Sequence, residues 1–281
     1  MAFDPDDDRF GPRRSDPSHA SAARIYDYVL GGDYHYAVDR AAAEEITKRM
    51  PLAPALAKYN RMWVQRVVRY LVAHCDVRQF LDIGSGIPTY GNVHEIAQEI
   101  EPTARVLYVD YERAAVDLGL EILEDNPYAT SLHADMRQPD LILTDPVTTS
   151  TLDFTKPIAM IWGSMLHFIE DRDDPFGICA RYKEMLKPGD YIALTHLTWQ
   201  YVSGPDLERQ AHQGRDAYNA MVNATLNIRD VDSIMWFFKD TELVEPGLVP
   251  APDWKPDSAN YEPDLTDKAR TFLVGGVGRL V

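Results

Sequence analysis

Glycine and aspartate residues between positions 82 and 110 are the residues of this chain best spaced to bind a nucleoside. Gly84 and Gly86 have no Cβ, so the backbone there can adopt positive φ and let a ligand lie directly on the main chain. Asp82 directly precedes this turn, and Asp110 ends the next apolar run. An acid at the end of a second strand is placed to accept hydrogen bonds from both hydroxyls of a ribose. The alternative is an ordinary strand-to-helix turn beside a surface acid.

The residues around the turn discriminate between cofactors. A dinucleotide site requires a third glycine and free amides for a pyrophosphate, but this turn continues into Pro88, which lacks an amide hydrogen. No Lys-Ser or Lys-Thr pair closes the turn as in a phosphate-binding loop. Asp82 would repel a pyrophosphate and would attract a cationic amino-acid tail. The sequence therefore favours S-adenosylmethionine over a dinucleotide. Farther along, Asp135 can accept from an adenine amino group, and Met136 can pack on the ring.

Two histidines lie at the ends of predicted strands. His167 follows the fourth strand and should lie at the same sheet edge as the glycine turn, where an imidazole can take a proton from a nucleophile. The alternative is a histidine that bonds a backbone carbonyl and holds a loop. His196, at the end of the fifth strand, has the same two interpretations.

The amino-terminal region supplies one cation and a group of tyrosines. Arg61 can bind a carboxylate by bidentate pairing, although a solvated helix cation is equally consistent with the sequence. Tyrosines surround the pair Gly31-Gly32 and can form an aromatic lid over a sulfonium or a flat substrate, or simply pack in a core. They are Tyr26, Tyr28, Tyr34 and Tyr36.

Hydrophobic periodicity predicts an α/β fold that positions these residues. Short apolar runs alternate with helical patterns, which is typical of a parallel sheet with helical crossovers. The predicted strands are 78–83, 105–109, 130–133, 157–162, 191–197, 242–244 and 272–280. The predicted helices are 21–30, 37–50, 54–74, 92–101, 112–124, 174–186, 207–223 and 231–239, with a loop at 246–262. Asn92 and Glu95 have the spacing of a capping box, and we expect the free amides of that helix to face the ligand.

Composition limits the partners. The chain has 281 residues and a net charge of −16, with no basic stripe, so nucleic-acid substrates are disfavoured. Cys75 and Cys179 have no metal or disulfide spacing and are expected to be buried free thiols. Since no signal peptide or membrane span is recognisable, we expect a cytoplasmic protein with no metal and no membrane partner. The predicted organisation is a disordered acidic arm (1–18), a helical cap or lid (19–76) and a core (77–281).

The chain resembles a bacterial family of S-adenosylmethionine-dependent methyltransferases known mostly from genomes. The resemblance covers about residues 18–281 and rests on strings of the sequence. They are Ala23-Arg24-Ile25-Tyr26-Asp27-Tyr28-Val29-Leu30-Gly31-Gly32, Asn60-Arg61, Phe80-Leu81-Asp82-Ile83-Gly84-Ser85-Gly86-Ile87-Pro88-Thr89, Leu166-His167-Phe168-Ile169 and Gly276-Val277-Gly278-Arg279.

The resemblance implies a Rossmann-like, seven-stranded, mostly parallel sheet whose last strand is antiparallel, with S-adenosylmethionine as the ligand. We expect an enzyme that transfers the methyl group in line to a small-molecule acceptor. It implies that Asp82, Gly84, Ser85 and Gly86 hold the methionine moiety, Asp110 the ribose, and Asp135 with Met136 the adenine. The other predicted cofactor contacts are Arg61, Tyr111, Gly163 and Ser164. Two alternatives remain: a protein that binds the nucleoside without turnover, and a nicotinamide-dependent oxidoreductase.

Overall fold

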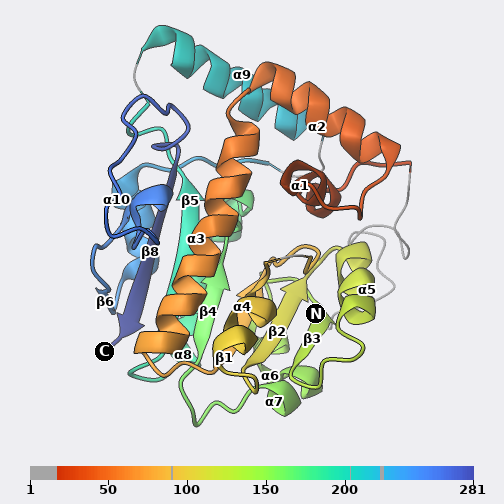
Figure 1. The fold of residues 1–281 in the computed structure, drawn as a ribbon. Coiled ribbons are helices and arrows are strands. Elements are labelled where there is room, and N and C mark those ends of the chain that lie inside the picture. Colours follow the sequence, from red (N-terminus) through yellow and green to blue (C-terminus); the bar gives the residue numbers. More distant parts are fainter. Residues whose placement is uncertain (1–17, 90, 203, 222–224) are drawn as a thin grey trace.

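A mixed sheet flanked by helices forms the centre of the molecule (Figure 1). The computed structural model describes residues 18–281 except residues 90, 203 and 222–224. The predicted arm at 1–18 lies outside the described residues except for Ser18. The predicted helix at 207–223 lies within them except for its last two positions, 222 and 223.

The described residues form an eight-stranded sheet in which the order β3-β2-β1-β4-β5-β8-β6 is continuous and β7 pairs with β8. The strands are β1 (Gln79–Ile83), β2 (Arg105–Asp110), β3 (Ala129–His133), β4 (Ala159–Trp162), β5 (Tyr191–Leu197), β6 (Thr241–Leu243), β7 (Val249–Pro250) and β8 (Leu273–Leu280). Strands β1 to β5 pair in parallel, and β8 runs antiparallel to β5 and β6. The predicted Rossmann-like fold, with its antiparallel last strand, is confirmed. The addition is β7, two residues within the expected loop at 246–262.

Helices cover both faces of this sheet (Figure 1). The α-helices are α1 (Ala22–Leu30), α2 (Ala37–Arg49), α3 (Ala53–His74), α4 (Val93–Ile100), α5 (Arg113–Ile122), α6 (Pro139–Thr144), α7 (Pro146–Thr151), α8 (Pro175–Glu184), α9 (Pro205–Met221) and α10 (Val231–Met235). The periodicity predicted no element at 139–151, where α6 and α7 form. Each begins with a proline in its first turn, and each is too short for a clear helical period.

The alternation of side chains along the strands builds two cores. Phe80 of β1 packs with Trp63 and Val67 of α3 on one face, whereas the next residue, Leu81, packs with Tyr182 of α8 on the other. This period of two is what a strand buried on both faces requires. Helix α3 is therefore held against the sheet along its length, and it can present side chains at the carboxyl ends of the strands.

A third small core lies above that sheet edge, between α1, α2 and α9. Ile25 of α1 packs with Ala43 and Ile46 of α2, and Tyr218 of α9 packs against them. Figure 1 shows α2 and α9 crossing above the sheet, with α1 beside them. We call α1, α2 and α9 the roof.

The cysteines and the helix lengths were also predicted from the sequence. Both cysteines are free, as predicted, and Cys179 is buried, but Cys75 is only partly buried because it caps the end of α3. Among the residues that the structure describes, no helix is both long and apolar enough to cross a lipid bilayer.

Candidate active site

A cavity of about 680 Å³ lies between the carboxyl ends of the strands and the roof. It brings together most of the residues that the sequence singled out: Tyr26, Arg61, Asp82, Gly84, Ser85, Gly86, Asp110, Tyr111, Asp135, Met136, Gly163, Ser164 and His167. Its lining does not include Tyr28, Gly31, Gly32 or Tyr34. The volume lies within the range of small-molecule sites, which is roughly 300–1,000 Å³.

The glycine turn after β1 presents bare main chain to this cavity. Gly84 and Gly86 have φ angles of +70° and +63°. The Gly84 amide donates to the Val109 carbonyl at 2.7 Å, which ties the turn to β2. A Cβ on Gly84 would lie 2.3 Å from the sulfur of Met165, which itself lines the cavity. The absence of a side chain at Gly84 therefore lets Met165 pack directly against the main chain of the turn.

Two buried acids flank the turn. Asp110 accepts from the amide of Gly86 at 2.7 Å through one oxygen and from the amide of Glu112 at 2.8 Å through the other. Burial raises the pKa of Asp110. Burial also raises the pKa of Asp82 to about 7, the charge of Asp110 adds to this rise, and Arg61 opposes it. Acids in this state favour a cationic ligand, because a positive charge would offset their desolvation.

Glu112 is a third acid in the lining, and the sequence analysis missed it. Its carboxylate accepts from the hydroxyl of Ser21, which caps α1. Burial, with the charge of Asp110, raises the pKa of Glu112 to about 7. Glu112 therefore joins the end of β2 to the roof. No sequence signal distinguishes it from a surface acid at a helix start.

Asp135 lies in the lining but is already paired. Arg137 donates to both of its oxygens, from Nε to Oδ1 at 3.0 Å and from Nη2 to Oδ2 at 2.6 Å. The backbone amide of Arg137 donates to the same carboxylate at 2.9 Å. An adenine amino group would share these oxygens with Arg137, a partner that the sequence analysis missed although it is two residues away. Met136, which is buried, lies beside them.

Arg61 projects from α3 toward the acids. Its guanidinium lies 5.6 Å from the centre of the Tyr26 ring and also donates to Asn92. Its Nε is buried without a hydrogen-bond partner. A buried donor of this kind is costly unless a ligand accepts from it.

The start of α4 differs from the prediction. Glu95 accepts from the amide of Asn92 at 3.3 Å, as a capping box requires, and from the amide of Gly91. These residues are not part of the cavity lining. Glu95 thus satisfies the N-cap and the residue before it, and the helix amide of His94 donates to the Tyr108 hydroxyl at 2.9 Å instead of facing a ligand.

The pair Gly31-Gly32 ends α1. Gly31 adopts the left-handed conformation at the C-cap, with φ of +85°. A Cβ on Gly32 would lie 2.1 Å from a carboxylate oxygen of Asp27, whose other oxygen accepts from the amide of Tyr34. This geometry explains both glycines as a helix stop. Tyr26 is the member of the tyrosine cluster that lines the cavity.

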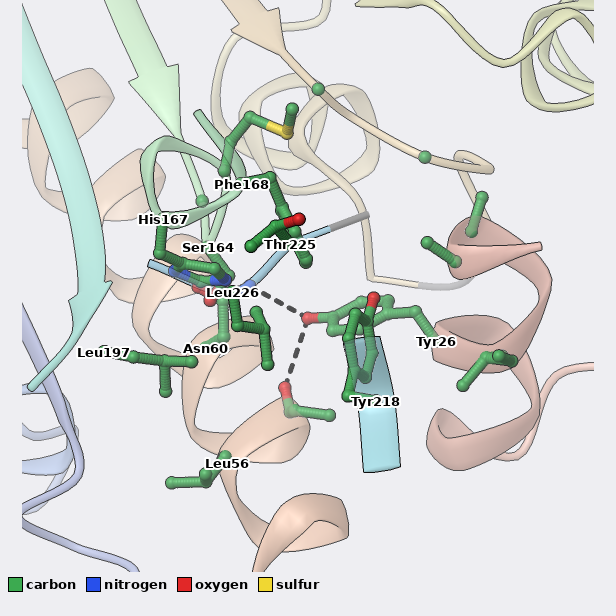
Figure 2. Close-up of a pocket in the computed structure, with 18 of the residues that line it drawn as sticks. Tyr26, Leu56, Asn60, Ser164, His167, Phe168, Leu197, Tyr218, Thr225 and Leu226 are labelled. Carbon is green, nitrogen blue, oxygen red and sulfur yellow. Dashed lines mark hydrogen bonds between the residues drawn. The ribbon is translucent and has the colours of Figure 1, made fainter. Parts of the chain in front are cut away.

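A chain of hydrogen bonds joins the sheet to α3 and α1. The Ser164 amide donates to the Thr195 hydroxyl at 2.7 Å, and that hydroxyl donates to Asn60 Oδ1 at 2.6 Å. Asn60 Nδ2 donates to the Tyr26 hydroxyl at 2.9 Å, which in turn donates to the carbonyl of Ala57 (Figure 2). These bonds fix Tyr26 and Asn60 at the cavity wall.

The two histidines have different environments. His167 lines the cavity, is 3 % exposed, and has no hydrogen-bond partner for its buried Nδ1. Burial, with the charges of His196 and Arg229, lowers the pKa of His167 well below its usual value. His196 lies outside the lining, bonds Leu197 and Arg229, and has a pKa lowered to about 3, chiefly by burial. Its position matches the structural interpretation, that of a histidine bonded to a backbone carbonyl.

Arg229 holds the segment that carries His167. This buried guanidinium donates to the carbonyls of Leu166 and Ile169, at 3.1 and 2.9 Å, and to Asp171 at 2.6 Å. The contacts bracket His167 from both sides in sequence. Arg229 is far from His167 along the chain, so no local motif predicts that it supports this segment.

Comparison with known proteins decides between the cofactors. Residues 9–281 match the model of a family described as S-adenosyl methyltransferase. The chain belongs to the S-adenosyl methyltransferase family. It is therefore an S-adenosylmethionine-dependent enzyme, as predicted, and the interpretations as a non-catalytic nucleoside binder and as an oxidoreductase are set aside. No curated protein matches the chain.

Two solved structures are similar to this methyltransferase over nearly its whole length. A DUF574 family protein from Streptomyces avermitilis is 35 % identical, with a TM-score of 0.87, and the match covers 95 % of this chain and 99 % of that one. A predicted methyltransferase from Thermobifida fusca is 33 % identical, with a TM-score of 0.85 and coverage of 94 % and 96 %. Both have the same fold as this methyltransferase.

The residues at the glycine turn fit S-adenosylmethionine. Gly86 leaves space beside its main chain, since a Cβ there would come no closer than 3.7 Å to Ala23, and Asp82 supplies an anionic oxygen at the same turn. The unpartnered Nε of Arg61 offers a donor for a carboxylate. Cation, carboxylate and nucleoside are the three chemical parts of this cofactor, and each has a complementary group in the lining.

Proposed function

We propose that this enzyme transfers the methyl group in line to a small-molecule acceptor enclosed between the sheet edge and the roof. The observation that carries this proposal is the lining of the cavity by all three roof helices, with Tyr26 from α1, Ile46 from α2 and Tyr218 from α9. An acceptor held beneath packed helices must be small. The acids of the lining and the net charge of −16 disfavour a nucleic acid in the same place.

The proposed cofactor contacts follow from the charges and positions of the lining residues. Asp82 pairs with the ammonium, Arg61 with the carboxylate and Asp110 with the ribose hydroxyls. Asp135 and Met136 hold the adenine, and the remaining contacts come from Gly84, Ser85, Gly86, Tyr111, Gly163 and Ser164. When bound, S-adenosylmethionine would supply a methyl group on a positively charged sulfur. The sulfur keeps the electrons of the broken carbon–sulfur bond and becomes a neutral thioether.

The chain contributes orientation and exclusion of water. Holding two reactants in line can lower the barrier by roughly 7–11 kcal/mol without an acid or a base. The hydrogen bonds that fix Tyr26 and Asn60 make a rigid wall for this purpose. We propose that His167 orients the acceptor as a neutral imidazole, since its lowered pKa makes it a weak proton acceptor at neutral pH.

The cofactor affinity should depend on pH through Asp82. Its pKa of about 7 means that it holds a proton below that pH, whereas an ammonium favours the carboxylate. Binding therefore releases the proton, and S-adenosylhomocysteine should bind about tenfold more tightly at pH 8 than at pH 6. In the ligand-free chain the same raised pKa favours folding at low pH, a contribution lost as the pH rises from about 4 through 7. Calorimetric titration at several pH values measures this dependence.

Two variants test whether the pH dependence of S-adenosylhomocysteine affinity comes from the carboxyl group of Asp82. Asp82→Asn should bind weakly with a flat pH profile, while Glu112→Gln, which alters the other acid with a pKa of about 7, should keep the slope. A slope that persists in Asp82→Asn would contradict the proposed ammonium contact.

Transfer itself is tested with methyl-labelled S-adenosylmethionine and a bacterial extract separated by size. We expect label in the small-molecule fraction and none in protein or nucleic acid. His167→Ala should leave S-adenosylhomocysteine affinity within about threefold of the wild type and lower turnover by about tenfold or more, because His167 acts on the acceptor alone. Label in the macromolecular fraction would contradict a small acceptor, and lost cofactor binding in His167→Ala would mark His167 as structural.

A further inference from the structure

The cavity lining is divided by charge along the sheet. Asp82 and Asp110 lie at the ends of β1 and β2, and Glu112 and Asp135 follow β2 and β3, so acids gather on this side of the lining. On the other side of β1, where β4 and β5 lie, Glu170, Arg172 and Asp173 of the segment after β4 line the cavity together with a group of uncharged residues. We call this uncharged group the acceptor chamber and define it by the residues labelled in Figure 2. They are Tyr26, Leu56, Asn60, Ser164, His167, Phe168, Leu197, Tyr218, Thr225 and Leu226.

Most of the other charged side chains of the lining are in ion pairs, while Glu112 accepts from Ser21 and Arg61 donates to Asn92. Arg172 bonds Glu170 at 2.9 Å, and Arg215 bonds Asp216 at 2.7 Å. Arg137 lies between Asp135 and Asp173. A charged acceptor in the chamber would thus have no free counter-ion among these groups, and an unpaired buried charge is strongly unfavourable.

Several polar atoms of the chamber wall are already bonded. The Thr195 hydroxyl donates to Asn60, and the Tyr26 hydroxyl accepts from Asn60 and donates to Ala57. These protons are not available to a ligand. A polyhydroxylated acceptor such as a sugar would therefore leave many of its own groups without partners.

Two lining residues in the described part of the chain have a buried side-chain nitrogen without a hydrogen-bond partner. One lies on the side of the acids and the other lies in the chamber. Nε of Arg61 is on the cofactor side and Nδ1 of His167 is in the chamber. Because these two residues line the cavity, unlike Trp63 and Trp162, whose ring nitrogens also lack a partner, each is placed to bond a ligand group. A hydroxyl suits a neutral imidazole in either tautomer, because it can donate or accept, whereas an ammonium only donates and a carboxylate only accepts.

The chamber walls favour a flat, apolar body. The rings of Phe168 and Tyr218 lie 5.8 Å apart at 32°, so they present a continuous aromatic surface. Leu56, Leu197 and Leu226 line the same space (Figure 2). Burial raises the pKa of Tyr218, which keeps its phenol neutral.

We infer that the acceptor is an uncharged, flat and largely apolar molecule whose hydroxyl bonds Nδ1 of His167. The inference rests on the proposed function, since it concerns the acceptor of the same reaction. It excludes sugars because of their many hydroxyl groups, and it excludes charged metabolites such as amino acids.

Three ligands of one shape test the inference by binding alone: 2-naphthol, 2-naphthoate and naphthalene. Each is titrated calorimetrically into the full chain, with and without saturating S-adenosylhomocysteine. We expect 2-naphthol to bind at least about tenfold more tightly than 2-naphthoate and about fivefold more tightly than naphthalene. Equal or tighter binding of 2-naphthoate, or no binding of any of the three, would overturn the inference.

Two variants locate the contact. His167→Phe keeps a ring but removes its nitrogens, so the advantage of 2-naphthol over naphthalene should disappear. Phe168→Leu should weaken both ligands together and preserve their ratio. Unchanged preference for 2-naphthol in a folded His167→Phe variant that still binds S-adenosylhomocysteine would overturn the assignment. If the wild type binds no S-adenosylhomocysteine but ranks the three ligands as expected, the proposed function fails and the description of the chamber stands.

Discussion

Asp110→Asn should weaken binding of S-adenosylhomocysteine by about 100-fold. The carboxylate of Asp110 accepts from two backbone amides, those of Gly86 and Glu112, and is proposed to accept from the ribose. Asparagine has a similar shape, but its NH₂ group would face one of these donors. Loss of bonds to a charged group removes about 1.5–3 kcal/mol each, and 3 kcal/mol corresponds to about 100-fold in affinity. Isothermal titration calorimetry measures the change directly.

The control for Asp110→Asn is Asp117→Asn on α5. Asp117 is about half exposed, pairs with Arg113 on the same helix and lies outside the cavity lining. It should bind S-adenosylhomocysteine as the wild type does, which separates the local effect from the loss of one negative charge. Thermal unfolding shows whether Asp110→Asn is folded. A folded variant with unchanged affinity would disprove the proposed role of Asp110.

Arg229→Met should lower the free energy of unfolding by about 3 kcal/mol. Methionine fills part of the space but leaves the buried carbonyls of Leu166 and Ile169 and the ring nitrogen of His196 without their donor. A buried polar group without a partner costs about 1–3 kcal/mol, and domains of this kind have only about 5–15 kcal/mol in total. Urea unfolding followed by circular dichroism measures the difference. Turnover should fall as well, because the segment that carries His167 loses its support.

Arg209→Met is the matched control for Arg229→Met. Arg209 is exposed on α9 and pairs with Asp206 of the same helix. Exposed pairs contribute at most about 1 kcal/mol, so this variant should be nearly as stable as the wild type. A loss below about 1 kcal/mol in Arg229→Met would show that its bonds do not hold the segment.

The sheet could be predicted from the sequence because its signals are local. The apolar run that contains Phe80 and Leu81 predicts a strand buried on both faces, and the structure places these neighbours in opposite cores. The glycines of the turn and the acids at the ends of β1 and β2 have fixed offsets from such strands. The structure accordingly brings Asp82 and Asp110 to one cavity.

The roof and the protonation of the site could not be predicted, since they depend on residues far apart in the chain. Nothing local indicates that Tyr218 of α9 packs on α1 and α2. The sequence suggested a pKa near neutrality for His167, whereas burial and the distant Arg229 lower it. The predicted end of the first helix at Leu30 is confirmed by Gly31 and Gly32, but the contact of Asp27 with Gly32 could not be predicted from the spacing. Burial is a property of the folded chain and has no signature in residue spacing.

The strand ends and the roof contribute different parts of the cavity, and this affects how the acceptor specificity of such an enzyme can change. The proposed donor contacts lie at strand ends whose register the sheet fixes, whereas the chamber takes Tyr218, Thr225 and Leu226 from α9 and the segment after it. Substitutions in those three positions can remodel the acceptor pocket without touching Asp82 or Asp110. Selection can thus exchange substrates while the methylation machinery stays constant, which suits one scaffold to a wide chemical repertoire.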